Sequence, residues 1–201
     1  MILFGASGHG KVVIDILKKC DIPVSAIWDD DPQEDSILGI IVLQTSEKIP
    51  QYEQAIITIG NNDIRRKIAE TYSSWKYITA IHPSAVISDS ASVDDGTVIM
   101  ANAVVNPSAI IGKHCILNSG SVIEHDCVLR DYVHVSPNAA LAGNVEVGEG
   151  THIGIGACVI QGIKIGKWCT IGAGAVIIRD VPDFSTVVGN PGRIIKIENQ
   201  N

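Results

Sequence analysis

The chain has 201 residues and a formal net charge of −7, with 46% hydrophobic and 18% charged residues. This length suffices for a sizeable core in one domain or two, and the acidic balance lacks the basic footprint that nucleic-acid binding requires. Glycines interrupt the apolar start MILFGASGHG. Neither a signal peptide nor a membrane-spanning helix is therefore predicted, and we expect a cytoplasmic protein.

The first element of the chain is predicted to be a strand over residues 2–4. The glycine-rich segment GASGHG and then KVVIDILKK follow, with apolar residues at helical spacing in the latter. The order of strand, glycine loop and helix is typical of an anion site, because free backbone N–H groups face a ligand that glycines allow to approach closely.

Two further strands are predicted in the N-terminal part, PVSAIWDD and AIITIG, the second followed by a helix over 63–72. The first ends in Asp29 and Asp30, whose carboxylates can accept hydrogen bonds from a ribose or a uracil, and the second ends at Gly60 and Asn61. Open α/β sheets bind ligands where parallel strands end. We therefore expect these residues to meet Ser7 to His9 at one edge of the sheet.

The glycine loop reads G-x-x-G-x-G and not the dinucleotide pattern G-x-G-x-x-G. About eighty residues also hold only one mononucleotide half of a doubly wound fold. The loop therefore favours a nucleotide-sugar over NAD, with a purely structural tight turn as the remaining interpretation.

A six-residue repeat dominates the rest of the chain. Every sixth residue from Ile87 to Ile177 is aliphatic, and a second, mostly small column lies four positions after each. A fixed period of six is typical of a parallel β-helix, in which each hexad forms one face and one corner of a coil; the variable loops of a β-sandwich would destroy it. We predict an α/β domain over 1–81 and a β-helix domain with a C-terminal tail over 82–201, the repeat filling 86–181 in a little over five coils.

Two histidines of the repeat, His125 and His134, lie outside the inward-facing columns. His125 is flanked by Glu124 and Asp126, either of which can fix its tautomer and raise its basicity, as a general base requires. The alternative is a solvated surface histidine.

The other polar candidates carry weaker signals. His82 is interpreted as a linker residue, and His114 and His152 as surface or packing residues. No group of His, Cys, Asp and Glu has metal-ligand spacing, so no metal is predicted. Trp168 has no predicted role.

Several motifs together resemble one family, the hexapeptide-repeat acetyltransferases that modify nucleotide-linked sugars for bacterial surface glycans. The likeness is greatest to UDP-4-amino-sugar N-acetyltransferases, with sialic-acid O-acetyltransferases as near relatives. The motifs are GASGHG at 5–10, the Asp29–Asp30 pair, IGNNDIRRKI at 59–68, HPSA at 82–85, NSGSVIEHDC at 118–127, HVSPNAALAGNV at 134–145 and VVGNPGR at 187–193.

This resemblance implies a left-handed β-helix, a homotrimer with each site between two subunits, and His125 as the base. Asp126 would tune His125, with Glu124 as the alternative. The residues implied on the acetyl-coenzyme A side are His134, Gly143, Ile155 and Ala173. Those implied on the nucleotide-sugar side are Ser7, Gly8, His9, Asp29, Asp30, Gly60 and Asn118.

The activity that follows is direct acetyl transfer from acetyl-CoA to the 4-amino group of a UDP-linked sugar, with no covalent enzyme intermediate. O-acetylation of sialic acid or another sugar hydroxyl is the alternative, because the same base and donor serve both. A non-catalytic hexapeptide scaffold and an NAD oxidoreductase are the remaining classes; the short first domain argues against the second.

Overall fold

The computed structural model describes residues 1–45, 49 and 54–198. The N-terminal part is a parallel sheet with one antiparallel edge strand, in the order β3-β4-β2-β1-β5-β6. Its elements are β1 (Ile2–Phe4), α1 (Gly8–Lys19), β2 (Ala26–Asp29), β3 (Ser36–Ile37), β4 (Ile40–Gln44), β5 (Gln54–Ile57), α2 (Asn62–Thr71) and β6 (Lys76–Tyr77). Strand β1 lies between β2 and β5, so the strand order reverses beside β1, where such sheets bind ligands.

Helix α1 begins three residues earlier than its apolar pattern predicts. Gly8, His9 and Gly10 belong to its first turn, and Ser7 is the N-cap residue. Val13, Ile14, Ile16 and Leu17 are buried, whereas Val12 is exposed. The buried stripe of α1 therefore includes every apolar residue of KVVIDILKK except Val12.

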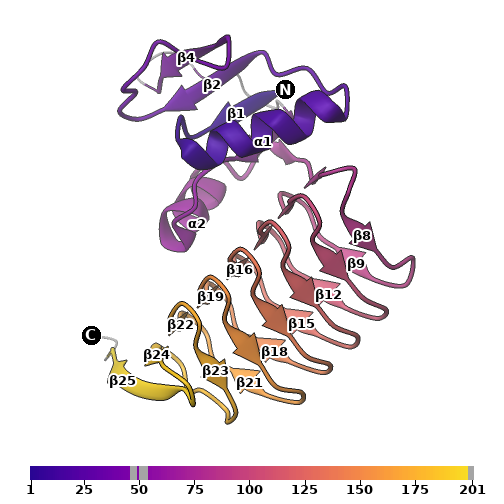
Figure 1. Cartoon of the computed structure of the whole chain (residues 1–201). Helices are drawn as coiled ribbons and strands as arrows, with labels where there is room; N and C mark the ends of the chain where they lie inside the picture. Colours follow the sequence, from indigo (N-terminus) through magenta and orange to yellow (C-terminus); the bar gives the residue numbers. More distant parts are fainter. Residues whose placement is uncertain (46–48, 50–53, 199–201) are drawn as a thin grey trace.

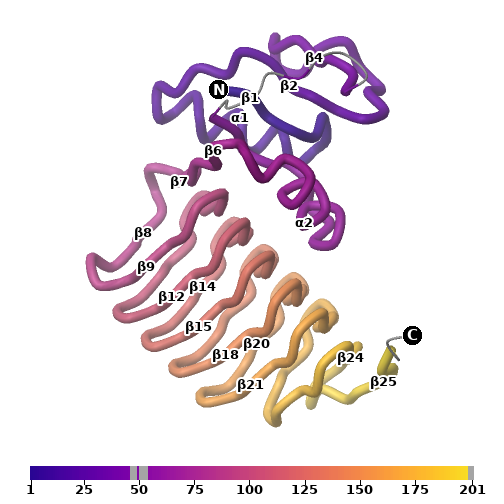
Figure 2. The backbone as a smooth tube through the Cα atoms, turned by 180° about the vertical axis from the view of Figure 1, so that it is seen from behind, coloured from indigo at the N-terminus to yellow at the C-terminus, as the bar shows by residue number. Residues whose placement is uncertain are grey.

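The C-terminal part is a parallel β-helix of short strands in three sheets (Figures 1 and 2). One sheet has eight strands, which we call the junction sheet, and the others have six and five. The junction sheet contains β7 (Ala80–Ile81), β10 (Val98–Ile99), β13 (Ile116–Leu117), β16 (His134–Val135), β19 (His152–Ile153), β22 (Thr170–Ile171), β24 (Ser185–Val188) and β25 (Arg193–Ile197). The six-stranded sheet contains β8 (Val86–Ile87), β11 (Val104–Val105), β14 (Val122–Ile123), β17 (Ala140–Leu141), β20 (Cys158–Val159) and β23 (Val176–Ile177). The five-stranded sheet contains β9 (Ser92–Val93), β12 (Ile110–Ile111), β15 (Val128–Leu129), β18 (Glu146–Val147) and β21 (Lys164–Ile165).

The hexad pattern explains this geometry directly. Between β7 and β23, neighbouring strands of a sheet pair residues eighteen apart, for example Val98 with Ile116 and Ile116 with His134. Aliphatic and small residues of both predicted columns form one continuous core between the sheets. Strands β7 and β24 extend the ladder beyond 86–181 at both ends, and β7 begins two residues before the predicted domain boundary.

The α/β part packs on the junction sheet, at the end where the first coils lie (Figure 1). Ala80, Val98 and Ile116 of that sheet share an apolar cluster with Leu3 and Ile14. Toward later coils the outward position becomes polar, first His134 and then His152. The apolar coils therefore hold the α/β part, and the polar coils lie under the edge of its sheet.

Candidate active site

The structure brings the three predicted loops of the α/β part to one sheet edge. The Ala6 N–H donates to Asp29 Oδ2 at 2.7 Å, and the Ser7 hydroxyl donates to the Thr58 carbonyl at 3.2 Å. These bonds join the loop after β1 to the ends of β2 and β5. The carboxyl ends of the strands thus form one surface, as parallel strand order requires.

The two aspartates also accept hydrogen bonds that hold the loop after β2, one from within the loop and one from the residue after β4. Asp29 Oδ1 accepts from the Asp31 N–H at 2.9 Å, and Asp30 Oδ1 accepts from the Thr45 hydroxyl at 2.6 Å. A carboxylate oxygen accepts more than one hydrogen bond, so each retains capacity for a ligand.

The glycines of the first loop have different reasons to be glycine. Gly5 has φ +117°, and a Cβ at Gly10 would lie 2.9 Å from the Gly5 carbonyl oxygen. A Cβ at Gly8 would meet nothing within 4 Å. Gly5 and Gly10 are therefore needed for the turn itself, whereas Gly8 leaves open space at the start of α1.

His134 and His152 form a stacked pair on the junction sheet, with ring centroids 4.8 Å apart. Asn118 Nδ2 lies 3.2 Å from His134 Nε2, and the Ser136 hydroxyl lies 2.7 Å from His152 Nε2. His134 also contacts the backbone of Gly60. Although His134 was grouped with the acetyl-coenzyme A residues, this chain places it beside Asn118 and Gly60 from the nucleotide-sugar group.

The histidines at this junction are held neutral. Burial is the main cause that lowers the pKa of His134 to about 3, with His152, Arg65 and His9 adding to it. Burial and then the Arg65 charge lower the pKa of His9 to about 4. Neither imidazole is therefore tuned to exchange a proton near neutral pH, as a general base must be.

His125 lies at a different place, on the corner that follows β14. Its side chain is 60% exposed, and Nδ1 lies 2.8 Å from Asp126 Oδ2. Asp126 has φ +61°, and in this corner conformation the short carboxylate meets the ring of the preceding residue. Glu124 instead accepts from the His125 backbone N–H at 3.4 Å. With Nδ1 donating to Asp126, Nε2 keeps its lone pair.

Gly143 occupies the same corner one coil later and supports the His125 ring. A Cβ at Gly143 would lie 2.5 Å from His125 Cε1 and 2.6 Å from Nε2. The next residue in this column is Gln161, so the corner itself admits a side chain. Within the part of the chain that the structure describes, no acceptor meets the Gly143 N–H.

Ile155 and Ala173 lie on a third line, the corners that follow β19 and β22. Both are exposed, and they are one coil apart, since the Gly174 N–H donates to the Ile155 carbonyl at 2.8 Å. The predicted site residues thus occupy separate edges and faces of one prism. A single chain does not bring His125 to the loops around Ser7 and Gly60.

Sequence reasoning missed a set of residues between α2 and the β-helix. We call the corner residues His114, Tyr132, Gly150 and Trp168 the α2 corner; they lie at intervals of eighteen residues. His114 packs on Tyr77 and Tyr132, which confirms its interpretation as a packing residue. The Trp168 ring fills the space that a Cβ at Gly150 would need. The Arg66 guanidinium lies over the same ring, with its Cζ 4.6 Å from the ring centroid. The eighteen-residue spacing of these four residues is the sequence signal that could have grouped them.

A hollow of about 560 Å³ lies beside this corner, lined by residues 60–63, His152 and Trp168 among others. Across residues 1–45, 49 and 54–198, the side chains form no cluster of three or more potential metal ligands. No helix in these ranges has both the length and the apolarity to cross a membrane.

Two family models match the chain. Residues 1–72 match the PglD N-terminal domain, and residues 90–125 and 144–179 match the bacterial transferase hexapeptide model. These matches and the coiled fold define a hexapeptide-repeat transferase with an added N-terminal domain.

Solved structures match almost the entire chain. PerB from Caulobacter crescentus, in complex with CoA and GDP-perosamine, has a TM-score of 0.90 at 36% identity, covering 97% of this chain and 96% of that one. The acetyltransferase domain of PglB from Neisseria gonorrhoeae, in complex with acetyl coenzyme A, has a TM-score of 0.89 at 38% identity, covering 96% and 98%. The chain therefore belongs to the family of hexapeptide-repeat sugar acetyltransferases with a PglD N-terminal domain, and the left-handed β-helix is confirmed.

A curated relative matches a shorter region. UDP-N-acetylbacillosamine N-acetyltransferase of Bacillus subtilis is 43% identical over 109 residues. The match covers 49% of this chain and 50% of that protein, so it spans about half the length of each.

Proposed function

We propose that this protein transfers the acetyl group of acetyl-CoA to the 4-amino group of a UDP-linked amino-deoxy sugar, with His125 as the general base. The observation that carries the proposal is the exposed His125 ring, oriented by Asp126 at 2.8 Å and seated on Gly143. The Bacillus subtilis relative, named for a UDP-sugar, supports the nucleotide. Because PerB binds GDP-perosamine, a GDP-linked amino sugar is the second acceptor to test beside the UDP-linked one.

The proposed reaction is a direct displacement. The neutral amine attacks the thioester carbonyl carbon, and its proton passes to His125 Nε2. The Gly143 N–H stabilises the oxyanion that develops. The carbon–sulfur bond then breaks, and the CoA thiolate leaves and takes up a proton.

The separation of the residues in one chain supports a site between subunits. His125 lies on one edge of the prism, while Asn118, His134 and Gly60 lie at the junction sheet. A second copy that presents its junction sheet to the His125 corner would unite them. We therefore include a homotrimer in the proposal, since cyclic assemblies repeat one such contact around an axis.

The test is release of the CoA thiol with acetyl-CoA and a UDP-4-amino-4,6-dideoxy sugar. Removing a general base costs about 100- to 10,000-fold in rate, so we expect His125→Asn to lose activity to that extent. His82→Asn is the matched control and should retain wild-type turnover, because among the described residues the His82 imidazole bonds only to Ser84, in the first coil.

Other outcomes identify other functions. Equal turnover by wild type and His125→Asn would contradict the base assignment. Release with the GDP-linked amine alone would change the nucleotide, and release only with sialic acid or another hydroxylated sugar would establish O-acetylation. No release with any acceptor would contradict the enzymatic proposal.

A further inference from the structure

The first turn of α2 and the α2 corner meet through backbone carbonyls. His114, Tyr132 and Gly150 have φ of +53°, +62° and +67°. The N–H groups of these corner residues bond to the preceding coil, for example Tyr132 to the Lys113 carbonyl at 2.8 Å. Their carbonyl oxygens accept hydrogen bonds from α2 side chains.

Arg65 and Asn62 supply the donors, and together they reach three successive coils. Arg65 Nε donates to the His114 carbonyl at 2.8 Å, and Nη2 donates to the Tyr132 carbonyl at 2.9 Å. Asn62 Nδ2 donates to the Gly150 carbonyl at 2.9 Å. One helical turn is thereby bonded to a line of coil corners.

The remaining donors of Arg65 face the loop after β5. Nη1 donates to the carbonyls of Ile59 at 3.0 Å and Gly60 at 3.2 Å, and Nη2 donates to Asn62 Oδ1 at 2.9 Å. A guanidinium has five N–H donors, and these five contacts use all of them. Arg65 is 1% exposed, and its hydrogen-bond partners are carbonyl oxygens only.

Burying a cation is costly unless every donor is satisfied. General helix stability does not need this arrangement, since Asn61 already caps α2 by accepting from the Ile64 N–H at 3.0 Å. What Arg65 adds is a fixed position for two loop carbonyls relative to two coils. The loop residue Gly60 also touches His134 on the junction sheet, so the loop is held from both sides.

We propose that Arg65, supported by Asn62, is a positioning residue that sets where the loop of residues 59–62 lies over the β-helix, and hence where the acceptor amine is presented. The inference rests on the proposed function, in which Gly60 contacts the nucleotide-sugar. Displacing a bound reactant by about 1 Å costs on the order of 100-fold in rate. A lysine cannot replace Arg65, because three donors on a single nitrogen cannot span five separated acceptors.

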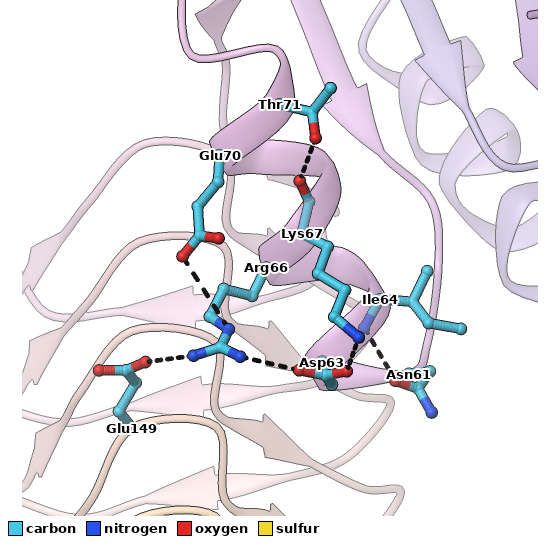
Figure 3. Close-up of polar contacts among 8 residues, drawn as sticks. All are labelled: Asn61, Asp63, Ile64, Arg66, Lys67, Glu70, Thr71 and Glu149. Carbon is cyan, nitrogen blue, oxygen red and sulfur yellow. Dashed lines mark hydrogen bonds and ion pairs between the residues drawn. The ribbon is translucent and has the colours of Figure 1, made fainter.

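The experiment compares Arg65→Lys, Arg65→Gln and Asn62→Ala with Arg66→Gln. Arg66 is the matched control, because it is the adjacent arginine of α2 but is partly exposed, and among the described residues its guanidinium contacts side chains and no loop carbonyl: it pairs with Asp63, Glu70 and Glu149 (Figure 3) and lies over Trp168. Steady-state kinetics give kcat and the KM of each substrate. Hydrogen exchange of residues 57–62 and thermal unfolding are measured on the same preparations without substrate.

We expect Arg65→Lys and Arg65→Gln to lower kcat about 10- to 100-fold and to raise the KM of the nucleotide-sugar while leaving that of acetyl-CoA within about twofold. Asn62→Ala, which keeps Arg65, should show the same split to a smaller extent. Hydrogen exchange over 57–62 should accelerate in these variants and not in Arg66→Gln.

Wild-type kinetics in Arg65→Lys would overturn the inference. So would a parallel change in both KM values, and so would unaltered exchange over residues 57–62. If the wild type transfers no acetyl group, the proposed function fails, and exchange then decides the positioning role alone. If Arg65→Gln does not fold, Arg65→Lys and Asn62→Ala carry the test.

Discussion

The reach of Asp126 to His125 is decided by one dihedral angle. Adjacent residues of an extended strand point to opposite faces, so a histidine and the next carboxylate would not meet there. In the corner, φ of +61° at Asp126 turns its carboxylate to His125 Nδ1 at 2.8 Å. The sequence made Asp126 the expected partner of His125, with Glu124 as the alternative, because it does not reveal which residue adopts the left-handed conformation.

Asp126→Asn should therefore lower kcat by about tenfold or more, since the amide can hold Nδ1 in the wrong tautomer. Glu124→Gln is the matched control, because among the described residues the Glu124 carboxylate bonds only to the backbone N–H of His125; its kcat should stay within about twofold of wild type. The measurement is thiol release at saturating substrates. A larger loss in the Glu124 variant would assign the orienting role to Glu124.

At the scale of elements, each two-residue strand from β8 to β23 contributes one inward aliphatic residue to a shared core. Leu141 on β17 is fully buried, and Ile110 on β12 points outward with half of its surface exposed. Leu141→Ala should destabilise the fold by about 2–5 kcal/mol, through lost transfer free energy and the cavity that remains. Ile110→Ala should cost under about 1 kcal/mol. Urea unfolding of both variants measures the difference, and equal midpoints would contradict the inward assignment of Leu141.

The elements differ in how far the sequence reveals them. The β-helix can be predicted from the sequence, because its period fixes which residues face inward and where each coil turns. The contact between α2 and the coils cannot be predicted in this way, because Arg65 bonds to backbone carbonyls, which every residue has. A charged residue in a helical segment such as IRRKI is also expected to be exposed to solvent. Only the fold distinguishes the buried Arg65 from the partly exposed Arg66.

The resemblance predicted a site between two subunits but did not say which residues each subunit supplies. Sequence motifs grouped His134 with Gly143, Ile155 and Ala173, whereas one chain places these residues on a face and two different edges. Motif reasoning assigns a role to each residue but says nothing of which residues share a subunit. Which residues lie close together in one subunit follows from the β-helix geometry, in which residues six apart lie on different faces.

For the whole molecule, the junction between the two parts predicts a pH dependence of stability. Burial, as the main cause, lowers the pKa of His9 to about 4, of His114 to about 4 and of His134 to about 3, and the Arg65 charge lowers each further. The unfolded histidines take up protons near pH 6.5. Stability is therefore complete above that pH and is lost as the pH falls toward the folded pKa values.

We expect the free energy of unfolding to be constant from pH 8 to 7 and to fall below pH 6.5. Each buried histidine contributes at most about 1.4 kcal/mol per pH unit. Burial also lowers the pKa of His152, so His114→Gln should make the decline shallower by removing one of four such groups. Urea unfolding at pH 8, 7, 6 and 5 gives the curves. A stability that increases on acidification would contradict burial of neutral imidazoles at the junction.

The contact of α2 with successive coils depends on two repeat lengths that nearly coincide. Helical residues advance about 1.5 Å each, so a step of three residues, such as that from Asn62 to Arg65, covers about 4.5 Å. Neighbouring strands are spaced by about 4.8 Å. The step from Asn62 at Gly150 to Arg65 at Tyr132 thus matches one coil spacing to within about 0.3 Å, and the guanidinium of Arg65 itself covers the next coil, at His114. Coils added after Trp168 would lengthen the prism without disturbing this match, whereas one coil added between Tyr132 and Gly150 would separate the two anchors by a whole repeat.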